Sequence, residues 1–302
     1  MYSLVKNTNF EPCNHDKKME TQIPESELIL NNDGSIYHLH LLPEDIANTI
    51  ILVGDQERVH EVSKYFDKVE IKKHKREFFT HTGYVGTKRV SVLSTGIGTD
   101  NIDICMNELD ALVNVDLTTR EIKKEHTALN IIRIGTSGSL QSNIAVDSVV
   151  ISEQGLGLDS VMHFYKRQRN TELEQSIKEQ LGYEFLYPYI ENGSTDLINQ
   201  LNLNYIKGIT ATCCGFYAPQ GRFLKAKGIS FDLINKLTNL NVGGKKVTNF
   251  EMETAAIYGL ASVLGHQSIS VNCIVANRIN NVFSKNPAKI IDDTIKDVLA
   301  TL

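Results

Sequence analysis

Apolar and polar positions follow two periods along this chain. Short β-branched apolar runs, typical of buried strands, alternate with longer segments whose apolar residues recur at helical spacing. The runs that predict strands span residues 37–41, 49–53, 89–93, 128–134, 146–152, 205–213, 247–250 and 268–275. The segments that predict helices follow residue 58 and span 101–112, 171–181, 232–240, 251–261 and 294–302. This alternation predicts an α/β fold with a largely parallel sheet covered by helices.

Two stretches, residues 1–34 and 118–125, depart from that alternation. Residues 1–34 are polar and lack periodicity, which predicts an N-terminal extension that is at least partly mobile. Residues 35–302 contain no Pro/Ser-rich linker or internal repeat and are predicted to form one domain. Residues 118–125 are rich in charge and predict a solvated excursion. Residues 37–41 alternate strictly and predict an edge strand with His38 and His40 on one face.

Composition narrows the classes of function. The chain has 302 residues, 41% hydrophobic and 22% charged, as in ordinary soluble globular proteins. A net charge of −5 provides no basic field for nucleic acid. No apolar run approaches the roughly 18–20 residues of a membrane span, and the N-terminus lacks a signal pattern, so we expect a cytoplasmic protein. The five cysteines have neither disulfide-framework nor zinc spacing; we expect reduced core residues and no metal site.

One charged residue interrupts a predicted core strand. Arg133 follows a β-branched apolar run, and a guanidinium stays charged at any working pH. Because a buried unpaired charge is costly, Arg133 needs an anionic partner, either an internal carboxylate or a bound anion. Both alternatives remain open at this point. The following Gly135-Thr136-Ser137-Gly138 predicts a tight turn whose N–H and hydroxyl groups suit an oxyanion.

Polar groups also mark the ends of the other predicted strands and the start of an apolar helix. They are Gly54 and Arg58, Gly96 and Gly98, Gln220 and Arg222, Glu251 and Glu253, and Asn277 and Arg278. Ligands of open α/β sheets bind beyond the carboxyl ends of the strands, so we expect these groups to meet. Arginine matches phosphate, a carboxylate accepts hydrogen bonds from sugar hydroxyls, and a Gln-x-Arg pair fits a carbonyl–imide edge such as that of uracil. The pattern predicts a site for phosphate, sugar and base.

These motifs occur in an order that resembles the nucleoside phosphorylase-I superfamily of purine nucleoside and uridine phosphorylases. The resemblance runs from about residue 36 to the C-terminus. Gln220-Gly221-Arg222 and Asn277-Arg278 match the uridine phosphorylase branch, whereas the purine-cleaving branch has a catalytic Asp that Ala276-Asn277-Arg278 lacks. The resemblance implies a single-domain α/β fold with a twisted mixed sheet, partly closed as a barrel and flanked by helices.

The resemblance also implies a reaction, the phosphorolysis of uridine to uracil and ribose 1-phosphate in pyrimidine nucleoside salvage. Phosphate would be a co-substrate, with no cofactor. The residues assigned to phosphate are Gly54, Arg58, Arg133, Thr136 and, from the neighbouring subunit, Arg76. Those assigned to the ribose are Met252, Glu253 and the neighbour's His38, and those assigned to the base are Phe216, Gln220, Arg222 and Arg278. Arg133, Gln220, Arg222 and Glu253 are expected to carry catalysis.

The shared site implies a homodimer at minimum, and the resemblance leaves a hexamer built from dimers open. Some members hold a monovalent cation between subunits through a Glu matched by Glu77. The next ligand in that pattern is a Ser, whereas this chain has Asn101, so the ion is not predicted. Three alternatives remain for the function: a purine nucleoside phosphorylase, a hydrolytic nucleosidase, and a non-catalytic nucleoside-binding protein on the same fold.

Overall fold

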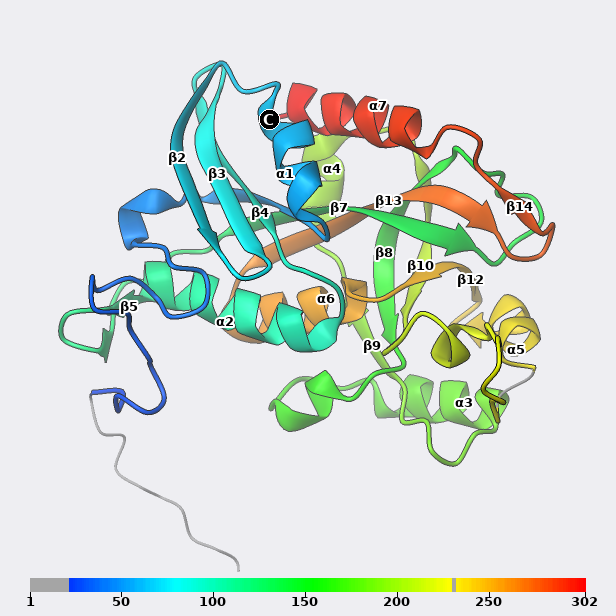
Figure 1. Cartoon of the computed structure of the whole chain (residues 1–302). Helices are drawn as coiled ribbons and strands as arrows, with labels where there is room; N and C mark the ends of the chain where they lie inside the picture. Colours follow the sequence, from blue (N-terminus) through cyan, green and yellow to red (C-terminus); the bar gives the residue numbers. More distant parts are fainter. Residues whose placement is uncertain (1–21, 230–231) are drawn as a thin grey trace, which may run out of the picture.

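The computed structural model describes residues 22–229 and 232–302, which form a twisted mixed sheet with helices packed on both faces (Figure 1). In spatial order, the strands of the sheet are β11 (Asn241–Val242), β12 (Lys245–Glu251), β10 (Ile206–Thr212), β8 (Val149–Gly157), β13 (Gln267–Asn277), β7 (Asn130–Ser139), β1 (Thr49–Val53), β4 (Lys88–Ser94), β3 (Phe78–Val85) and β2 (Lys68–Lys75). Two shorter strands extend it, β14 (Val282–Phe283) beside β13 and β9 (Tyr189–Asn192) beside β8.

Strand β1 shows why the sheet is covered on both faces. All five of its residues are buried, and successive side chains point to opposite sides. Ile50 and Leu52 join a core cluster with the helices α2 and α6. Ile51 and Val53 join another with α1, α4 and α7 (Figure 1). The α-helices are α1 (Gln56–Ser63), α2 (Thr99–Asn114), α3 (Thr171–Leu181), α4 (Thr195–Leu201), α5 (Leu233–Asn239), α6 (Thr254–Leu264) and α7 (Pro287–Ala300).

Part of the sheet closes on itself. From β7 the chain of pairings runs through β13, β8, β10 and β12, and β12 returns to β7 through the pairs Asn249–Ser139 and Phe250–Gly138. Within this ring β7–β13, β8–β10 and β10–β12 are parallel, while β13–β8 and β12–β7 are antiparallel. The partly closed, mixed sheet implied by the resemblance is therefore confirmed. A largely parallel sheet, which periodicity alone predicted, is wrong.

Residues 37–41 do not form the predicted edge strand. Most of the segment is a turn, and His40 has a φ of +56°. The backbone N–H groups of His38 and Leu39 donate to the carboxylate of Glu108 on α2, at 3.0 and 2.8 Å, and are not paired with a neighbouring strand. Leu39 and Leu41 are both buried, so the alternation reflects a packed turn.

The described part of the predicted N-terminal extension, residues 22–34, lies against the domain. Leu28 belongs to the core cluster of α2 and α6. The N–H of Ile23 donates to the carbonyl of Arg120, and Gln22 forms an isolated antiparallel β-bridge with Glu121. The charged excursion is thus a short hairpin, β5 (Val115–Asp116) and β6 (Glu121–Ile122), that holds this segment. The predicted mobility of residues 1–21 lies outside the described residues.

Helix α3 coincides with its predicted range, and α5 lies within the predicted range 232–240. Asp232 occupies the N-cap position of α5 without a capping hydrogen bond from its side chain. Its carboxylate accepts a hydrogen bond from the Tyr183 hydroxyl and pairs with Lys236 instead.

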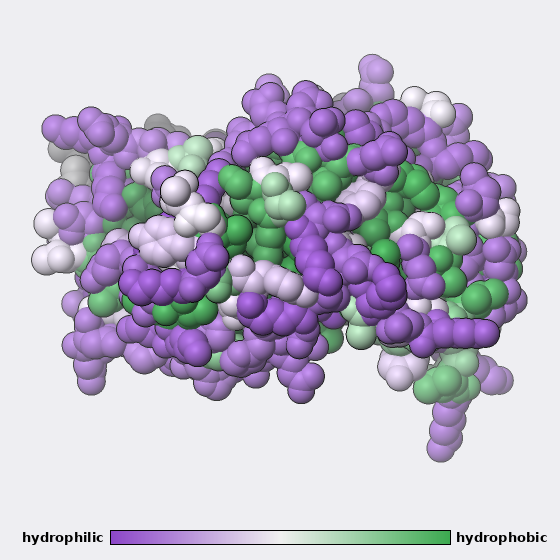
Figure 2. All heavy atoms as spheres, turned by 90° about the horizontal axis from the view of Figure 1, so that it is seen from above, coloured by the Kyte–Doolittle hydropathy of each residue, from purple (hydrophilic) through white to green (hydrophobic). Residues whose placement is uncertain are grey.

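Seen from above, hydrophilic residues cover most of the surface, and hydrophobic residues show mainly in the hollows between them (Figure 2). In the described part of the chain, no helix combines the length and the apolar character that crossing a membrane requires.

Candidate active site

A pocket of about 640 Å³ opens where β1, β7, β12 and β13 end, beside the loop that follows β10. It brings together ten of the predicted site residues, namely Gly54, Arg58, Arg133, Thr136, Phe216, Gln220, Arg222, Met252, Glu253 and Arg278. The polar strand ends therefore meet as expected, except that Gly96 and Gly98 are absent from the lining, where Ile97 between them is present.

Arg133 reaches this pocket because the next residue on its face of the strand is a glycine. β7 continues through Ser139, so the predicted tight turn after Arg133 is wrong. Side chains at positions i and i+2 of a strand share a face, and the guanidinium of Arg133 lies over Gly135. A Cβ at Gly135 would lie 1.7 Å from Nη1 of Arg133. A glycine is therefore required at position 135 to leave space for the guanidinium of Arg133. Thr136 and Ser137, which follow it, continue the strand.

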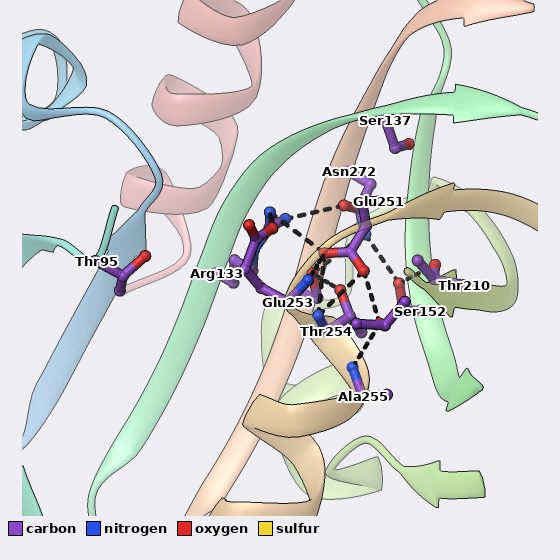
Figure 3. Close-up of polar contacts among 12 residues, drawn as sticks. Thr95, Arg133, Ser137, Ser152, Thr210, Glu251, Glu253, Thr254, Ala255 and Asn272 are labelled. Carbon is purple, nitrogen blue, oxygen red and sulfur yellow. Dashed lines mark hydrogen bonds and ion pairs between the residues drawn. The ribbon is translucent and has the colours of Figure 1, made fainter. Parts of the chain in front are cut away.

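Two carboxylates hold the other edge of that guanidinium (Figure 3). Nη2 of Arg133 pairs with Oε2 of Glu253 and lies 3.3 Å from Oε2 of Glu251. Glu251 is the last residue of β12 and Glu253 is the N-cap of α6, which begins at Thr254, so the predicted helix start at residue 251 is three residues early. Of the two alternatives for Arg133, the internal ion pair is therefore present, and the same side chain also lines the pocket.

The two glutamates have different local roles. Glu251 accepts hydrogen bonds from the backbone N–H groups of Glu253 and Thr254 at 3.0 Å, and from the hydroxyl of Thr212 at 2.8 Å. It thereby satisfies free N–H groups at the start of α6. Glu253 instead accepts from the N–H of Gly98 at 2.9 Å, which ties the loop before α2 to the pocket. Glu253 keeps further acceptor sites for a ligand, because a carboxylate offers about four lone pairs.

The charges in this part of the pocket act on one another. Burial opposes the charge of Arg133, but the carboxylates of Glu253 and Glu251 outweigh it and raise the arginine pKa. Burial, and then the nearby charge of Arg133, lower the pKa of Arg58. Burial raises the pKa of Glu251 despite the attraction of Arg133. Arg58 and Arg133 repel each other, and a bound anion would reduce this repulsion.

Arginine and amide groups converge at the other end of the pocket. Arg222 donates to the side-chain oxygen of Gln220 at 2.5 Å, and its guanidinium lies 3.9 Å from the ring centroid of Phe216. Arg278 donates to the carbonyl of Gln220 at 3.1 Å and lies 5.5 Å from the ring of Phe250. Burial, and then the charge of Arg278, lower the pKa of Arg222 to about 10. Oε1 of Gln220 accepts one of the two hydrogen bonds that an amide oxygen can take, so the side chain keeps an acceptor site as well as its NH₂ donors for a ligand.

Arg76 and His38 do not line this pocket. Arg76 lies in the turn between β2 and β3, with a φ of +55°. Both residues lie around Tyr37: the His38 ring is 4.8 Å from the tyrosine ring centroid and the Arg76 guanidinium is 5.8 Å from it. Nδ1 of His38 is 2.6 Å from Glu108. The two residues that the resemblance assigned to a neighbour's site are thus grouped together, apart from the pocket of their own chain.

Several lining residues have no role assigned to them by the resemblance. They are Asp55, Ile97, Ser137, Gly138, Phe250, Glu251, Val275, Ala276, Asn277, Asn281, Val282 and Phe283. Ser137 and Gly138 belong to the stretch for which the sequence predicts a turn, and both lie in β7. Val282 and Phe283 belong to a two-residue strand, for which the sequence offers no periodic signal. Among the described residues, no group of three or more His, Cys, Asp or Glu side chains is arranged to hold a metal ion.

Residues 48–298 match the family model of the phosphorylase superfamily. The chain belongs to this superfamily. It is 30% identical over 277 residues to a uridine phosphorylase of Thermococcus kodakarensis, covering 89% of this chain and 86% of that protein. It is also 25% identical over 245 residues to a DeoD-type purine nucleoside phosphorylase of Buchnera aphidicola, covering 81% and 88%. A solved nucleoside phosphorylase of Trypanosoma brucei, described as showing uridine phosphorylase activity, superposes with a TM-score of 0.83 at 27% identity and covers 91% of this chain and 99% of that one.

Proposed function

We propose that this chain is a uridine phosphorylase, which cleaves uridine with inorganic phosphate. The observation that carries the proposal is that one pocket unites two arginines at one end, a glutamate beside them and a Gln–Arg pair at the other end. Those groups match the charge and hydrogen-bonding pattern of phosphate, ribose and uracil. Similarity to the uridine phosphorylases of T. kodakarensis and T. brucei supports the same substrate.

In this reaction Arg58 and Arg133 hold phosphate beside the anomeric carbon, and their contribution is position and charge. A phosphate oxygen forms the new bond to C1′, and the C1′–N1 bond breaks with its electron pair passing to the uracil ring. The transition state resembles an oxocarbenium ion, as in other glycosyl cleavages. Gln220 and Arg222 stabilise the negative charge that develops on uracil, and Glu253 fixes the ribose through its hydroxyls.

The remaining parts of the proposal concern assembly and setting. Arg76 and His38 do not line their own pocket, which supports a homodimer in which they complete the partner's phosphate and ribose sites. Phosphate is the co-substrate and no cofactor takes part. All four cysteines in the described ranges are free thiols, which suits a reducing compartment, and we propose that the enzyme acts in the cytoplasm in pyrimidine nucleoside salvage.

The proposal is tested with uridine and inosine, each supplied with and without phosphate, by following ultraviolet absorbance. We expect uridine cleavage that requires phosphate, with formation of ribose 1-phosphate, and much slower cleavage of inosine. Cleavage of uridine without phosphate would identify a hydrolytic nucleosidase. A preference for inosine would identify a purine nucleoside phosphorylase, which the similarity to the B. aphidicola enzyme keeps as the second candidate. Binding of uridine without turnover would identify a binding protein.

A further inference from the structure

The Nη1 edge of Arg133 is held by a residue outside the pocket lining. Oδ1 of Asn272 accepts a hydrogen bond from Nη1 at 3.1 Å (Figure 3). Asn272 lies on β13 directly opposite Gly135 of β7 in the parallel register, and its exposed fraction is 0%. The guanidinium therefore lies over the glycine of its own strand and beside the amide of the next strand.

The orientation of this amide is fixed by its partners. A guanidinium can only donate, so the carbonyl oxygen of Asn272 must face it. The NH₂ group then donates to Oγ of Ser152 at 2.9 Å and to Oγ of Ser270 at 3.1 Å. Ser152 is bonded in turn to Thr210 at 2.6 Å. Rotating the amide would break three hydrogen bonds in a buried region, where unmade bonds are expensive.

We propose that Asn272 is a positioning residue of the phosphate site. It holds the Nη1 edge of Arg133, so that the guanidinium keeps its place in the pocket and does not turn fully onto Glu251 and Glu253. The inference rests on the proposed function, in which Arg133 binds phosphate. A neutral acceptor suits this position because a third carboxylate beside Arg133 would add negative charge where a phosphate dianion binds.

The test measures phosphate binding to the full chain by isothermal titration calorimetry, for the wild type, Asn272→Ala and Asn272→Ser. We expect the dissociation constant for phosphate to rise about tenfold in both variants, as the orientation of one charged hydrogen-bond donor is lost. In steady-state assays the KM for phosphate should rise while the KM for uridine stays within twofold. Thr294→Val is the matched control, because it removes a buried hydroxyl of α7 that packs against β13 through Cys273. It should leave phosphate binding unchanged.

Asn272→Ser keeps the proposal testable if Asn272→Ala fails to fold. The serine oxygen stands where the Asn Cγ was, so it is too short to reach Nη1 but retains a polar group for Ser152 or Ser270. A folded variant that binds phosphate within twofold of the wild type overturns the inference, whatever its thermal stability. A wild type that binds phosphate but does not cleave uridine contradicts the proposed function alone, and the Asn272 comparison still applies. A wild type that binds no phosphate contradicts both.

Discussion

At the scale of single residues, the candidate site depends on how Arg133 is placed. Its charge is stabilised by two carboxylates and an amide, each contributed by a strand end or a strand other than its own. The guanidinium of Arg133 can therefore remain charged in the pocket, because its buried charge is paired. The glycine beneath the guanidinium is as necessary as the partners around it.

Replacing Gly135 with Ala tests that placement. The new Cβ would lie 1.7 Å from Nη1 of Arg133, so the guanidinium must move. We expect the phosphate dissociation constant to rise at least tenfold, since charged hydrogen bonds contribute about 1.5–3 kcal/mol each. Calorimetric titration with phosphate measures this. Ile134→Val is the control: that side chain belongs to the core cluster of α1, α4 and α7, and its shortening costs about 0.5–1.5 kcal/mol of stability without touching Arg133. Equal phosphate affinity in Gly135→Ala and the wild type would contradict the steric argument.

The sequence marked Arg133 because a charge in an apolar strand is conspicuous, but it could not identify its partners. Glu251, Glu253 and Asn272 lie more than a hundred positions further along the chain, and only the register of β13 against β7 and the end of β12 bring them to it. Periodicity reports which face a residue occupies, not which distant residue it meets. The same limit applies to the base site. Gln220 and Arg222 are neighbours in the sequence and form a visible pair, whereas nothing in the sequence links Phe250 to Arg222 and Arg278, which both lie over its ring.

At the scale of elements, helices and strands were predicted correctly where a periodic pattern of apolar residues matches their burial. The prediction failed where a side chain accepts the backbone hydrogen bonds that a neighbouring strand would otherwise accept. Helix α3 begins and ends as predicted because its apolar face is regular and Asn170 and Gly182 bound it as caps. Residues 37–41 alternate like a strand, yet Glu108 takes their N–H groups. The stretch after Arg133 has turn residues, yet it continues β7 because its backbone pairs with β13 as far as Ser139.

The packing of α3 against β9 makes a pH-dependent prediction. Glu191 of β9 is buried beside Arg167 and Glu174, at 2.9 Å from the former, and burial raises its pKa from 4.5 to about 7. Because the folded state holds this proton more tightly than the unfolded state, the stabilising contribution is full below about pH 4.5 and is lost as pH rises through 7.

Glu191→Gln removes the titration while keeping the shape. We expect the free energy of unfolding of the wild type, relative to this variant, to fall by on the order of 1 kcal/mol between pH 5 and pH 8, allowing for partial solvent screening. Urea unfolding at several pH values measures the difference. Glu153→Gln, which removes a half-buried carboxylate of β8 that pairs with Lys245, is the control for the loss of a carboxylate elsewhere in the sheet. A pH-independent difference for Glu191→Gln would exclude the raised pKa.

At the scale of the whole molecule, alternation of strands and helices predicted the α/β class but not the closure of the sheet. Closure rests on two residue pairs between β12 and β7, Asn249 with Ser139 and Phe250 with Gly138. It places Glu251, at the end of β12, and Glu253, two residues further on, beside Arg133. The partly closed barrel came only from the resemblance, because no local pattern specifies which strand a long connection returns to.

The assembly is tested by mixing two inactive proteins. Arg76 lies apart from its own pocket, whereas Arg133 lines it, so in the proposed dimer each active centre takes Arg133 from one chain and Arg76 from its partner. Arg76→Ala and Arg133→Ala should each have little activity alone. In a mixed dimer one of the two equivalent sites has both arginines intact, so an equal mixture after exchange should regain about a quarter of wild-type activity.

Mixing Arg133→Ala with Arg58→Ala is the control: if Arg58 and Arg133 act within one chain's pocket, every site of every dimer lacks one of them. No recovery in the first mixture after confirmed exchange, or full activity in a dilute monomer, would contradict a shared site.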